Sequence, residues 1–173
     1  MAFHQPDRYF SRVSAIDVDA DLRAPGFKHL IMDVDNTILT RDDHTVPPDV
    51  QAWLDRVCES GLDICLLSNN FHEGVLHLAD RLGLPIVARA VKPLPHGFLM
   101  ARSKLQGTRA DTVVVGDQLI TDVLGAHFLG MTAYMVCPLV EADLKHTLLL
   151  RNVERVLMGD RVPEAPPPFG IIS

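Results

Sequence analysis

The sequence predicts an α/β fold, with a mostly parallel sheet and helices on both of its faces. Short apolar runs alternate along the chain with segments of about ten residues that have helical periodicity. The run over 112–115 is threonine followed by three valines, which is typical of a strand buried on both faces. At 173 residues the chain has the size of one domain, and it contains no internal repeat.

Five apolar runs are predicted to be strands, over 27–32, 62–67, 85–87, 112–115 and 132–136. Helices are predicted between and after them, over about 47–60, 72–82, 96–105, 119–129 and 141–158. Proline at positions 47 and 48 is tolerated in a first helical turn, and Gly61, Gly83 and Gly107 each follow a predicted helix end. In the first helix Trp53 belongs to an apolar stripe, which predicts a place in the core.

Three regions follow from this order of elements. Residues 1–26, which end in a Pro25-Gly26 turn, are predicted to be an N-terminal arm or short helix. Residues 27–160 form the α/β domain, and residues 161–173 form a proline-rich tail that is extended or disordered.

Composition narrows the class of protein. A net charge of −6 argues against non-specific binding to nucleic acid, because the phosphate backbone would be repelled. Three cysteines without a CxxC pair argue against a disulfide framework. The N-terminus has no apolar signal core, and we therefore expect a cytoplasmic protein. Peripheral contact with a membrane stays open, because arginines lie near the end of the last predicted helix.

Four short polar clusters follow apolar runs and carry the functional signal. They are Asp33-Val-Asp35-Asn36-Thr37, Ser68-Asn69-Asn70, Lys92-Pro93 and Gly116-Asp117-Gln-Leu-Ile-Thr-Asp122. The carboxyl ends of strands in an open α/β sheet converge on one crevice, so these clusters are expected to meet in space. Together they would hold a divalent metal ion against a phosphate group.

The aspartates are candidates for the metal site. Asp33 and Asp35 are two apart, so their side chains point the same way if the chain stays extended, and they repel unless a cation relieves them. Asp117 could complete an oxygen-rich site of the kind that Mg2+ prefers. A solvated turn is the alternative for Asp33 and Asp35. For Asp122, helix capping, support of the site and direct ligation all stay open.

Ser68 and Lys92 supply groups that suit a phosphate. Backbone N–H groups at a helix start bind anions, and the Ser68 hydroxyl adds a donor; a simple helix N-cap uses the same geometry. Lys92 follows a short strand and could neutralise charge on the carboxylates and on a transferring phosphoryl group, although most lysines are surface residues. A carboxylate nucleophile would form an aspartyl-phosphate, and a second carboxyl would protonate the leaving oxygen.

The ordered set of clusters, over about residues 27–137, resembles the four signature motifs of the haloacid dehalogenase superfamily of phosphatases. The resemblance implies that Asp33 is the nucleophile and Asp35 the general acid/base. Ser68 and the backbone of Asn69 would hold the phosphate, and Lys92 would neutralise charge. The metal would be bound by Asp33, Asp117 and the main-chain carbonyl of Asp35. Asp122 and Thr37 would support these ligands.

Within the superfamily, the residues of the four motifs most resemble those of the YqeG-like group of subclass IIIA. That group is similar to the mitochondrial phosphatidylglycerophosphate phosphatases. The resemblance implies a Rossmann-like sheet of five strands in the order 5-4-1-2-3. Only about 35 residues separate Asp33 from Ser68, which leaves no room for a cap domain. An open crevice suits a phosphate on a bulky substrate, such as phosphatidylglycerophosphate, another lipid headgroup, a metabolite or a macromolecule. Alternatively, a partner subunit of a homo-oligomer covers it.

Two other classes of function use similar residues. A phospho-accepting signalling module also combines strand-end aspartates, a lysine and magnesium, but its acceptor aspartate should stand where Ser68 stands. A non-catalytic scaffold could retain the metal site as a structural element. Zinc is disfavoured, because the eight histidines are scattered and show no ligand spacing with cysteine; solvated or core positions are expected for them.

Overall fold

The structure is a computed structural model that describes residues 3–140, 157–159 and 161–164. In these residues six strands form one sheet, and all neighbouring strands are parallel. The strands are β1 (Arg8–Phe10), β2 (His29–Met32), β3 (Asp63–Leu67), β4 (Ile86–Val87), β5 (Thr112–Gly116) and β6 (Thr132–Val136). Their order across the sheet is β1-β6-β5-β2-β3-β4.

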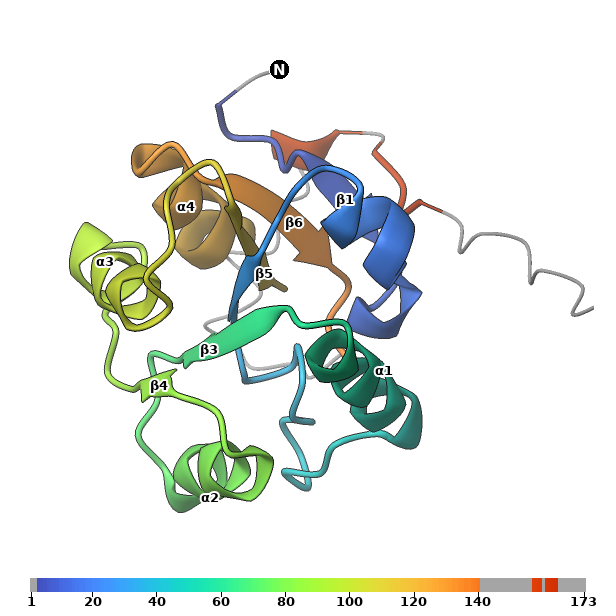
Figure 1. Cartoon of the computed structure of the whole chain (residues 1–173), viewed down its shortest axis with the longest axis vertical. Helices are drawn as coiled ribbons and strands as arrows, with labels where there is room; N and C mark the ends of the chain where they lie inside the picture. The colour runs from blue at the N-terminus through green and yellow to red at the C-terminus, as the bar shows by residue number, and fades with distance from the viewer. Residues whose placement is uncertain (1–2, 141–156, 160, 165–173) are drawn as a thin grey trace, which may run out of the picture.

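Helices cover both faces of the sheet. They are α1 (Pro48–Glu59), α2 (Glu73–Leu82), α3 (Pro95–Lys104) and α4 (Leu124–Phe128). Figure 1 shows α1 and α2 on one side of the strands and α3 and α4 on the other. The short helical segment η3 (Leu119–Val123) leads into α4, so the helix predicted over 119–129 consists of these two pieces.

The described residues contain two hydrophobic cores, and the apolar patterns of the sequence account for both. All five residues of β5 are buried, as expected for a central strand covered on both faces. In α1 the residues at spacings of three and four, including Trp53, face the core. The Trp53 indole Nε1 donates to the Ile16 carbonyl at 2.7 Å, which satisfies the only polar group of this buried side chain. The core position predicted for Trp53 is therefore confirmed.

The predicted fold class is confirmed, and the five predicted strands have the predicted order. The sheet also has a sixth strand, β1, which comes from the region predicted to be an arm or short helix. β1 pairs with β6 at the sheet edge, and its Phe10 is buried. The rest of that region forms two short helical segments, η1 (Val13–Ala15) and η2 (Val18–Arg23). A three-residue strand between polar residues has too few positions to show alternation.

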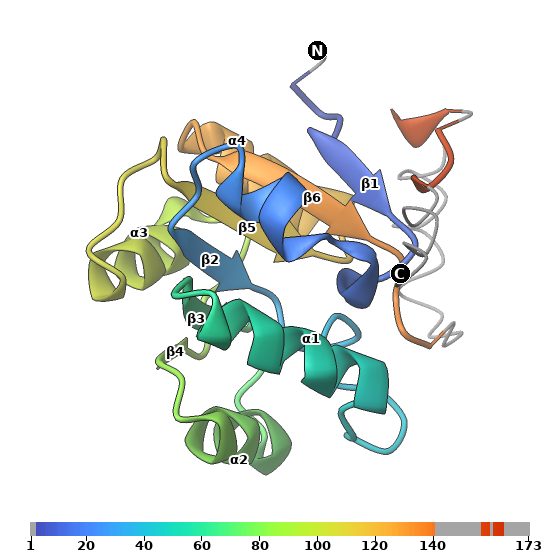
Figure 2. The ribbon, with the colours of Figure 1, turned by 45° about the vertical axis from the view of Figure 1, so that its right-hand side comes forward.

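The last described residues, 161–164, lie beside β1. Glu164 forms an isolated bridge with Phe10, and its side chain is paired with Arg8. Figure 2 places this last described segment next to β1. The helix predicted over 141–158 lies outside the described residues except for its last two positions, which are helical. The tail beyond position 164 also lies outside them.

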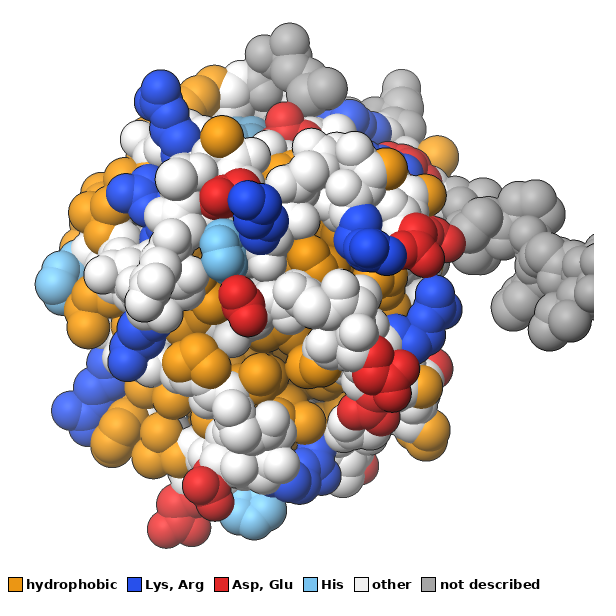
Figure 3. All heavy atoms as spheres, viewed as in Figure 1, with side chains coloured by type: hydrophobic (Ala, Val, Ile, Leu, Met, Phe, Trp, Pro, Cys, Tyr) orange, Lys and Arg blue, Asp and Glu red, His pale blue; other side chains and the backbone are white. Residues whose placement is uncertain are grey.

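Residues 3–140 are described without a break, and no further domain is inserted between their strands and helices. The predicted absence of a cap therefore holds for this part of the chain. None of the helices in the described residues is long and apolar enough to cross a membrane. On the face shown in Figure 3, lysine and arginine side chains are dispersed among acidic and hydrophobic ones.

Candidate active site

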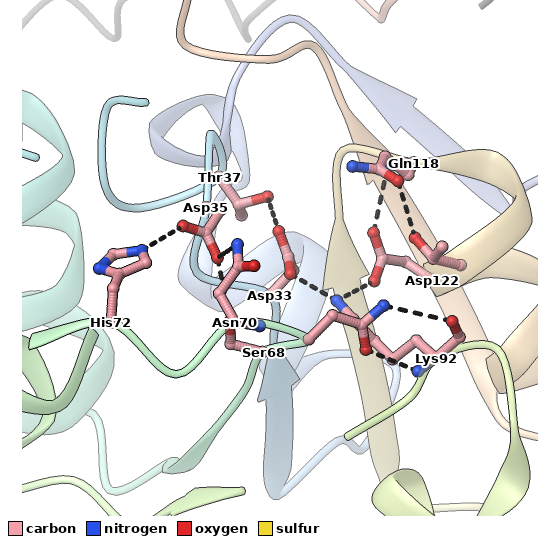
Figure 4. A network of polar contacts seen from close by, with 11 residues as sticks. Asp33, Asp35, Thr37, Ser68, Asn70, His72, Lys92, Gln118 and Asp122 are labelled. Atoms are coloured by element: carbon pink, nitrogen blue, oxygen red, sulfur yellow. Dashed lines mark hydrogen bonds and ion pairs between the residues drawn. The ribbon is translucent and has the colours of Figure 1, made fainter. Parts of the chain in front are cut away.

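The predicted clusters meet at the carboxyl end of the sheet. Asp33 directly follows β2, and its backbone N–H donates to the Val115 carbonyl of β5 at 2.9 Å. Ser68 directly follows β3, and its backbone N–H donates to the Val87 carbonyl of β4 at 3.0 Å. Figure 4 shows that side chains from these strand ends point toward one another. Parallel pairing thus brings together residues that are far apart in the sequence.

Three buried carboxylates, Asp33, Asp117 and Asp122, form the centre of the site. Each offers an oxygen atom that lies within 4.8 Å of the others. The Lys92 Nζ donates to Asp33 Oδ1 and, at 2.6 Å, to Asp122 Oδ1. The Thr37 hydroxyl donates to Asp33 Oδ2 at 3.1 Å. Lys92 is therefore a buried residue of the cluster and not a surface lysine.

The charges of this cluster do not balance. Three carboxylates and one ammonium group leave two net negative charges if all four are ionised. Burial, followed by the charges of Asp33 and Asp122, raises the pKa of Asp117 well above its ordinary value. Burial also raises the pKa of Asp33 to about 7, against the opposing effect of Lys92. Burial lowers the pKa of Lys92, but Asp122 and Asp33 outweigh it and raise that pKa overall. The cluster favours an additional proton or cation.

A divalent cation fits this donor set. Asp117 Oδ1 is buried and has no hydrogen-bond partner in the described residues, which is costly unless another group satisfies it. Asp122 differs, because Lys92 and the Gln118 backbone N–H, at 3.1 Å, already occupy its two oxygens. Of the three carboxylates Asp117 is therefore the best candidate for a ligand, because Asp33, like Asp122, already accepts hydrogen bonds at both oxygens, from Lys92 and Thr37. Asp122 holds Lys92 beside them. Carboxylate oxygens of this kind are the ligands that Mg2+ prefers.

Gly116 allows Asp122 to approach the end of β5. A Cβ atom at position 116 would lie 2.3 Å from Asp122 Cγ, far closer than two carbon atoms can pack. The glycine before Asp117 is therefore required by the packing of a carboxylate that comes from η3.

Asp35 faces a second polar group, which comes entirely from the loop between β3 and α2. The Ser68 hydroxyl and the Asn70 side-chain amide each donate to Asp35 Oδ2 at 2.9 Å, and His72 Nε2 lies 3.0 Å from Oδ1. Burial raises the pKa of Asp35, but the hydrogen bonds from His72, Asn70 and Ser68 outweigh it and lower that pKa. Asp33 and Asp35 therefore have different partners, although they are two residues apart.

Asn69 connects the two polar groups. Its side-chain Nδ2 donates to the Lys92 carbonyl at 3.2 Å, and its Oδ1 accepts the Lys92 backbone N–H at 2.6 Å. The side chain of Asn69 thus fixes the loop that carries Lys92. This contact adds to the role expected of its backbone, which was to hold a phosphate.

Asn36 fixes the turn after Asp35. Its φ of 68° lies in the left-handed region, which asparagine tolerates better than most residues. Its side chain donates to the Val140 carbonyl at 2.9 Å and accepts the Val140 N–H at 3.0 Å. The loop after β6 is thereby attached to the turn of the first polar cluster.

Asn70 and His72 are contacts of Asp35 that the sequence pattern did not indicate. The pattern predicts a helix start at Asn70 and a solvated or core position for His72. Their nearness to a strand end was a usable signal, because loops that leave the carboxyl ends of the strands line the crevice.

The fold and the site define a class of protein: a doubly wound α/β enzyme whose strand ends gather carboxylates around one buried lysine. The model of the haloacid dehalogenase-like hydrolase family matches residues 7–130. The chain belongs to this family and is a phosphatase of it.

Curated relatives carry phosphatase names. The probable phosphatase YqeG of Bacillus subtilis is 31% identical over 157 residues, which cover 91% of this chain and 91% of the relative. The ribulose-1,5-bisphosphate 5-phosphatase of Halopiger xanaduensis is 27% identical over 111 residues, which cover 59% of this chain and 46% of that protein.

A solved structure shares the fold. The cobalt-bound deoxy-D-mannose-octulosonate 8-phosphate phosphatase of Haemophilus influenzae aligns with a TM-score of 0.53 and 11% identity. The alignment covers 78% of this chain and 88% of the other.

Proposed function

We propose that this phosphatase hydrolyses phosphomonoesters through an aspartyl-phosphate formed on Asp33, with Mg2+ as its cofactor. The observation that carries the proposal is the buried cluster in which Lys92 contacts Asp33, while Asp117 Oδ1 has no hydrogen-bond partner among the described residues. A nucleophilic carboxylate, a fixed positive charge and a carboxylate that can bind a cation are the groups that phosphoryl transfer uses.

In the first half of the reaction, an Asp33 carboxylate oxygen attacks phosphorus and the bond to the leaving oxygen breaks. Against the effect of burial, hydrogen bonds keep the pKa of Asp35 low in the structure, so Asp35 has to take up a proton as the substrate binds. The negative charge of the phosphate and the departure of the Ser68 hydroxyl raise that pKa at this point. Asp35 then gives this proton to the leaving oxygen, and the product leaves as an alcohol. In the second half, Asp35 takes a proton from water as the water attacks phosphorus. Inorganic phosphate departs and the Asp33 carboxylate is regenerated.

The remaining residues hold charge and geometry. Lys92 neutralises the phosphoryl oxygens, while Asp122 and Thr37 keep Lys92 and Asp33 in place. Bound Mg2+, held by Asp33, Asp117 and the Asp35 carbonyl, would supply further positive charge against the phosphate. In the structure the Ser68 hydroxyl donates to Asp35. When a substrate binds, this hydroxyl donates to a phosphate oxygen instead, and the Asn69 backbone holds the same phosphate.

The substrate that we propose carries its phosphate on a bulky or exposed group, with phosphatidylglycerophosphate as the leading candidate. Support comes from the uninterrupted α/β domain over residues 3–140, which has no inserted domain to enclose a small molecule. A lipid substrate would require peripheral contact with a membrane from the cytoplasmic side. A soluble sugar phosphate is the second candidate, because the 27% identical relative is named for a sugar bisphosphate.

Parallel assays with 4-nitrophenyl phosphate, phosphatidylglycerophosphate in detergent micelles and ribulose 1,5-bisphosphate test both levels of the proposal. We expect turnover that needs Mg2+, stops with a chelator and is lost in Asp33→Asn. Preference for the micellar lipid supports the lipid assignment, and preference for the sugar bisphosphate contradicts it. A stable phosphoprotein without turnover would indicate a signalling module. A protein that shows no phosphorylation and no turnover would be a non-catalytic scaffold.

A further inference from the structure

His72 is the sole side chain in the described residues that is hydrogen-bonded to Asp35 Oδ1, because Ser68 and Asn70 share Oδ2. In Figure 4 the His72 ring approaches Asp35 from the side away from Lys92. If Ser68 turns to a bound phosphate, Oδ2 loses a donor while the contact of His72 with Oδ1 is unaffected. His72 is thus placed to hold Asp35 throughout the reaction.

The ring of His72 is itself fixed. The His44 ring lies against it, with 4.7 Å between the ring centroids and 37° between the planes. The backbone of Gly74 is also so near that a Cβ atom there would lie 3.1 Å from His72 Nδ1. Glycine at position 74 therefore makes room for this ring, and the His44 loop limits its movement.

We propose that His72 is a positioning residue for Asp35, and that it aims the carboxyl group at the oxygen of the departing alcohol. This inference rests on the proposed function, in which Asp35 protonates that oxygen. A carboxyl group with one free oxygen can rotate about its last torsion, and misalignment of an acid weakens catalysis strongly. A contact to Oδ1 restricts this rotation without touching the substrate.

The dependence of the rate on the leaving group separates positioning from a general structural role. The 4-nitrophenolate ion is a weak base that departs with little help, whereas phenolate is a stronger base and needs the proton of Asp35. His72→Leu removes the donor, so kcat/KM should fall about fivefold or more further for phenyl phosphate than for 4-nitrophenyl phosphate, within the range that acid catalysis contributes. The ratio kcat/KM reports formation of the aspartyl-phosphate, which is the step that needs the acid.

Two variants serve as matched controls. His72→Gln keeps an N–H donor at a similar reach and should restore most of the lost activity on phenyl phosphate. His77→Leu makes the same chemical change five residues further along, at an exposed position of α2 that has no contact with Asp35. This variant should leave kcat/KM unchanged for both substrates.

His44→Asn tests the proposal without changing His72, and it decides the matter if His72→Leu does not fold. Asparagine tolerates the φ of 54° at this position, so the substitution removes the neighbouring ring and leaves the backbone in place. The phenyl phosphate rate should again fall more than the 4-nitrophenyl phosphate rate, by a smaller factor. Equal losses on both substrates, or no recovery in His72→Gln, would overturn this inference alone. Absence of Asp33-dependent turnover in the wild-type protein would overturn the proposed function and this inference with it.

Discussion

The buried carboxylates of Asp33 and Asp117 make the fold sensitive to pH. Burial raises the pKa of Asp33 from its ordinary value of 3.8 to about 7, and it raises that of Asp117 in the same direction. Between pH 3.8 and about 7 the folded protein still binds protons that the unfolded chain has already released. The stability that comes from these protons is complete below the ordinary pKa and is lost as the pH rises to about 7.

A divalent cation should reverse this loss, because it takes the place of the missing protons. We predict that Mg2+ raises the melting temperature more at pH 8 than at pH 5. When the Mg2+ concentration is 100 times Kd, the free energy of unfolding should increase by about 2.7 kcal/mol. Thermal unfolding with Mg2+ and with a chelator measures the difference at each pH. Asp117→Asn, the matched control, should respond weakly to Mg2+ at both pH values. An equal Mg2+ effect at pH 5 and pH 8 in the native sequence would contradict the prediction.

Among single residues, those with a strong chemical signal at a strand end were predictable. Asp33, Asp117, Ser68 and Lys92 each follow an apolar run, and the topology of a parallel sheet brings such positions together. The partners of each side chain were not predictable, because they depend on the path of the loop after the strand. Ser68 shows this limit, since its hydroxyl was expected to face a phosphate and donates to Asp35 in the structure.

The loop between β3 and α2 and the loop between β4 and α3 act together through Asn69. Asn69→Ala removes both hydrogen bonds to the Lys92 backbone, and each such bond contributes about 0.5–1.5 kcal/mol. We predict a loss of about 1–3 kcal/mol in the free energy of unfolding, measured with urea. The kcat for an aryl phosphate should fall as well, because Lys92 loses its fixed position. Unchanged kcat together with reduced stability would show that this contact supports the fold and not Lys92.

The five predicted strands and helix α1 lie within one or two residues of their predicted ends, whereas the three-residue strand β1 was missed for a physical reason. Helix α1 has four buried residues at helical spacing, and the prediction placed its ends within a residue of the observed Pro48 and Glu59. Strand β1 has three residues, and pairing with β6 defines it, with Arg8 opposite Tyr134 and Phe10 opposite Val136. Such long-range pairing leaves no local pattern in a segment this short.

At the scale of the whole molecule, Arg8 of β1 connects the helical segment η2 and the last described segment to the edge of the sheet. Its guanidinium contacts the buried Asp21 and the half-exposed Glu164, and it lies 4.7 Å from the centre of the Phe10 ring. Arg8→Ala leaves Asp21 without its ion-pair partner, so we predict a loss of about 2 kcal/mol in stability. Glu164→Ala removes an exposed carboxylate and should cost about 1 kcal/mol or less. Urea unfolding compares the two; equal losses would contradict this assignment.

The family and the class of chemistry came from the order of motifs along the chain, which local sequence preserves. The additional edge strand and the contacts of the C-terminal segment depend on tertiary pairing, which the local sequence does not show. Phe10 is an example, because its backbone pairs with Val136 of β6 and with Glu164, and its side chain is buried.

Trapping of the phosphorylated protein tests the nucleophile directly. The wild-type protein, mixed with 4-nitrophenyl phosphate and Mg2+ and quenched in acid within milliseconds, should carry one phosphoryl group on the peptide that contains Asp33. Asp33→Asn should carry none and release no 4-nitrophenol. A phosphoryl group on another residue, or normal turnover in Asp33→Asn, would show that the buried cluster does not work as a phosphate-accepting carboxylate.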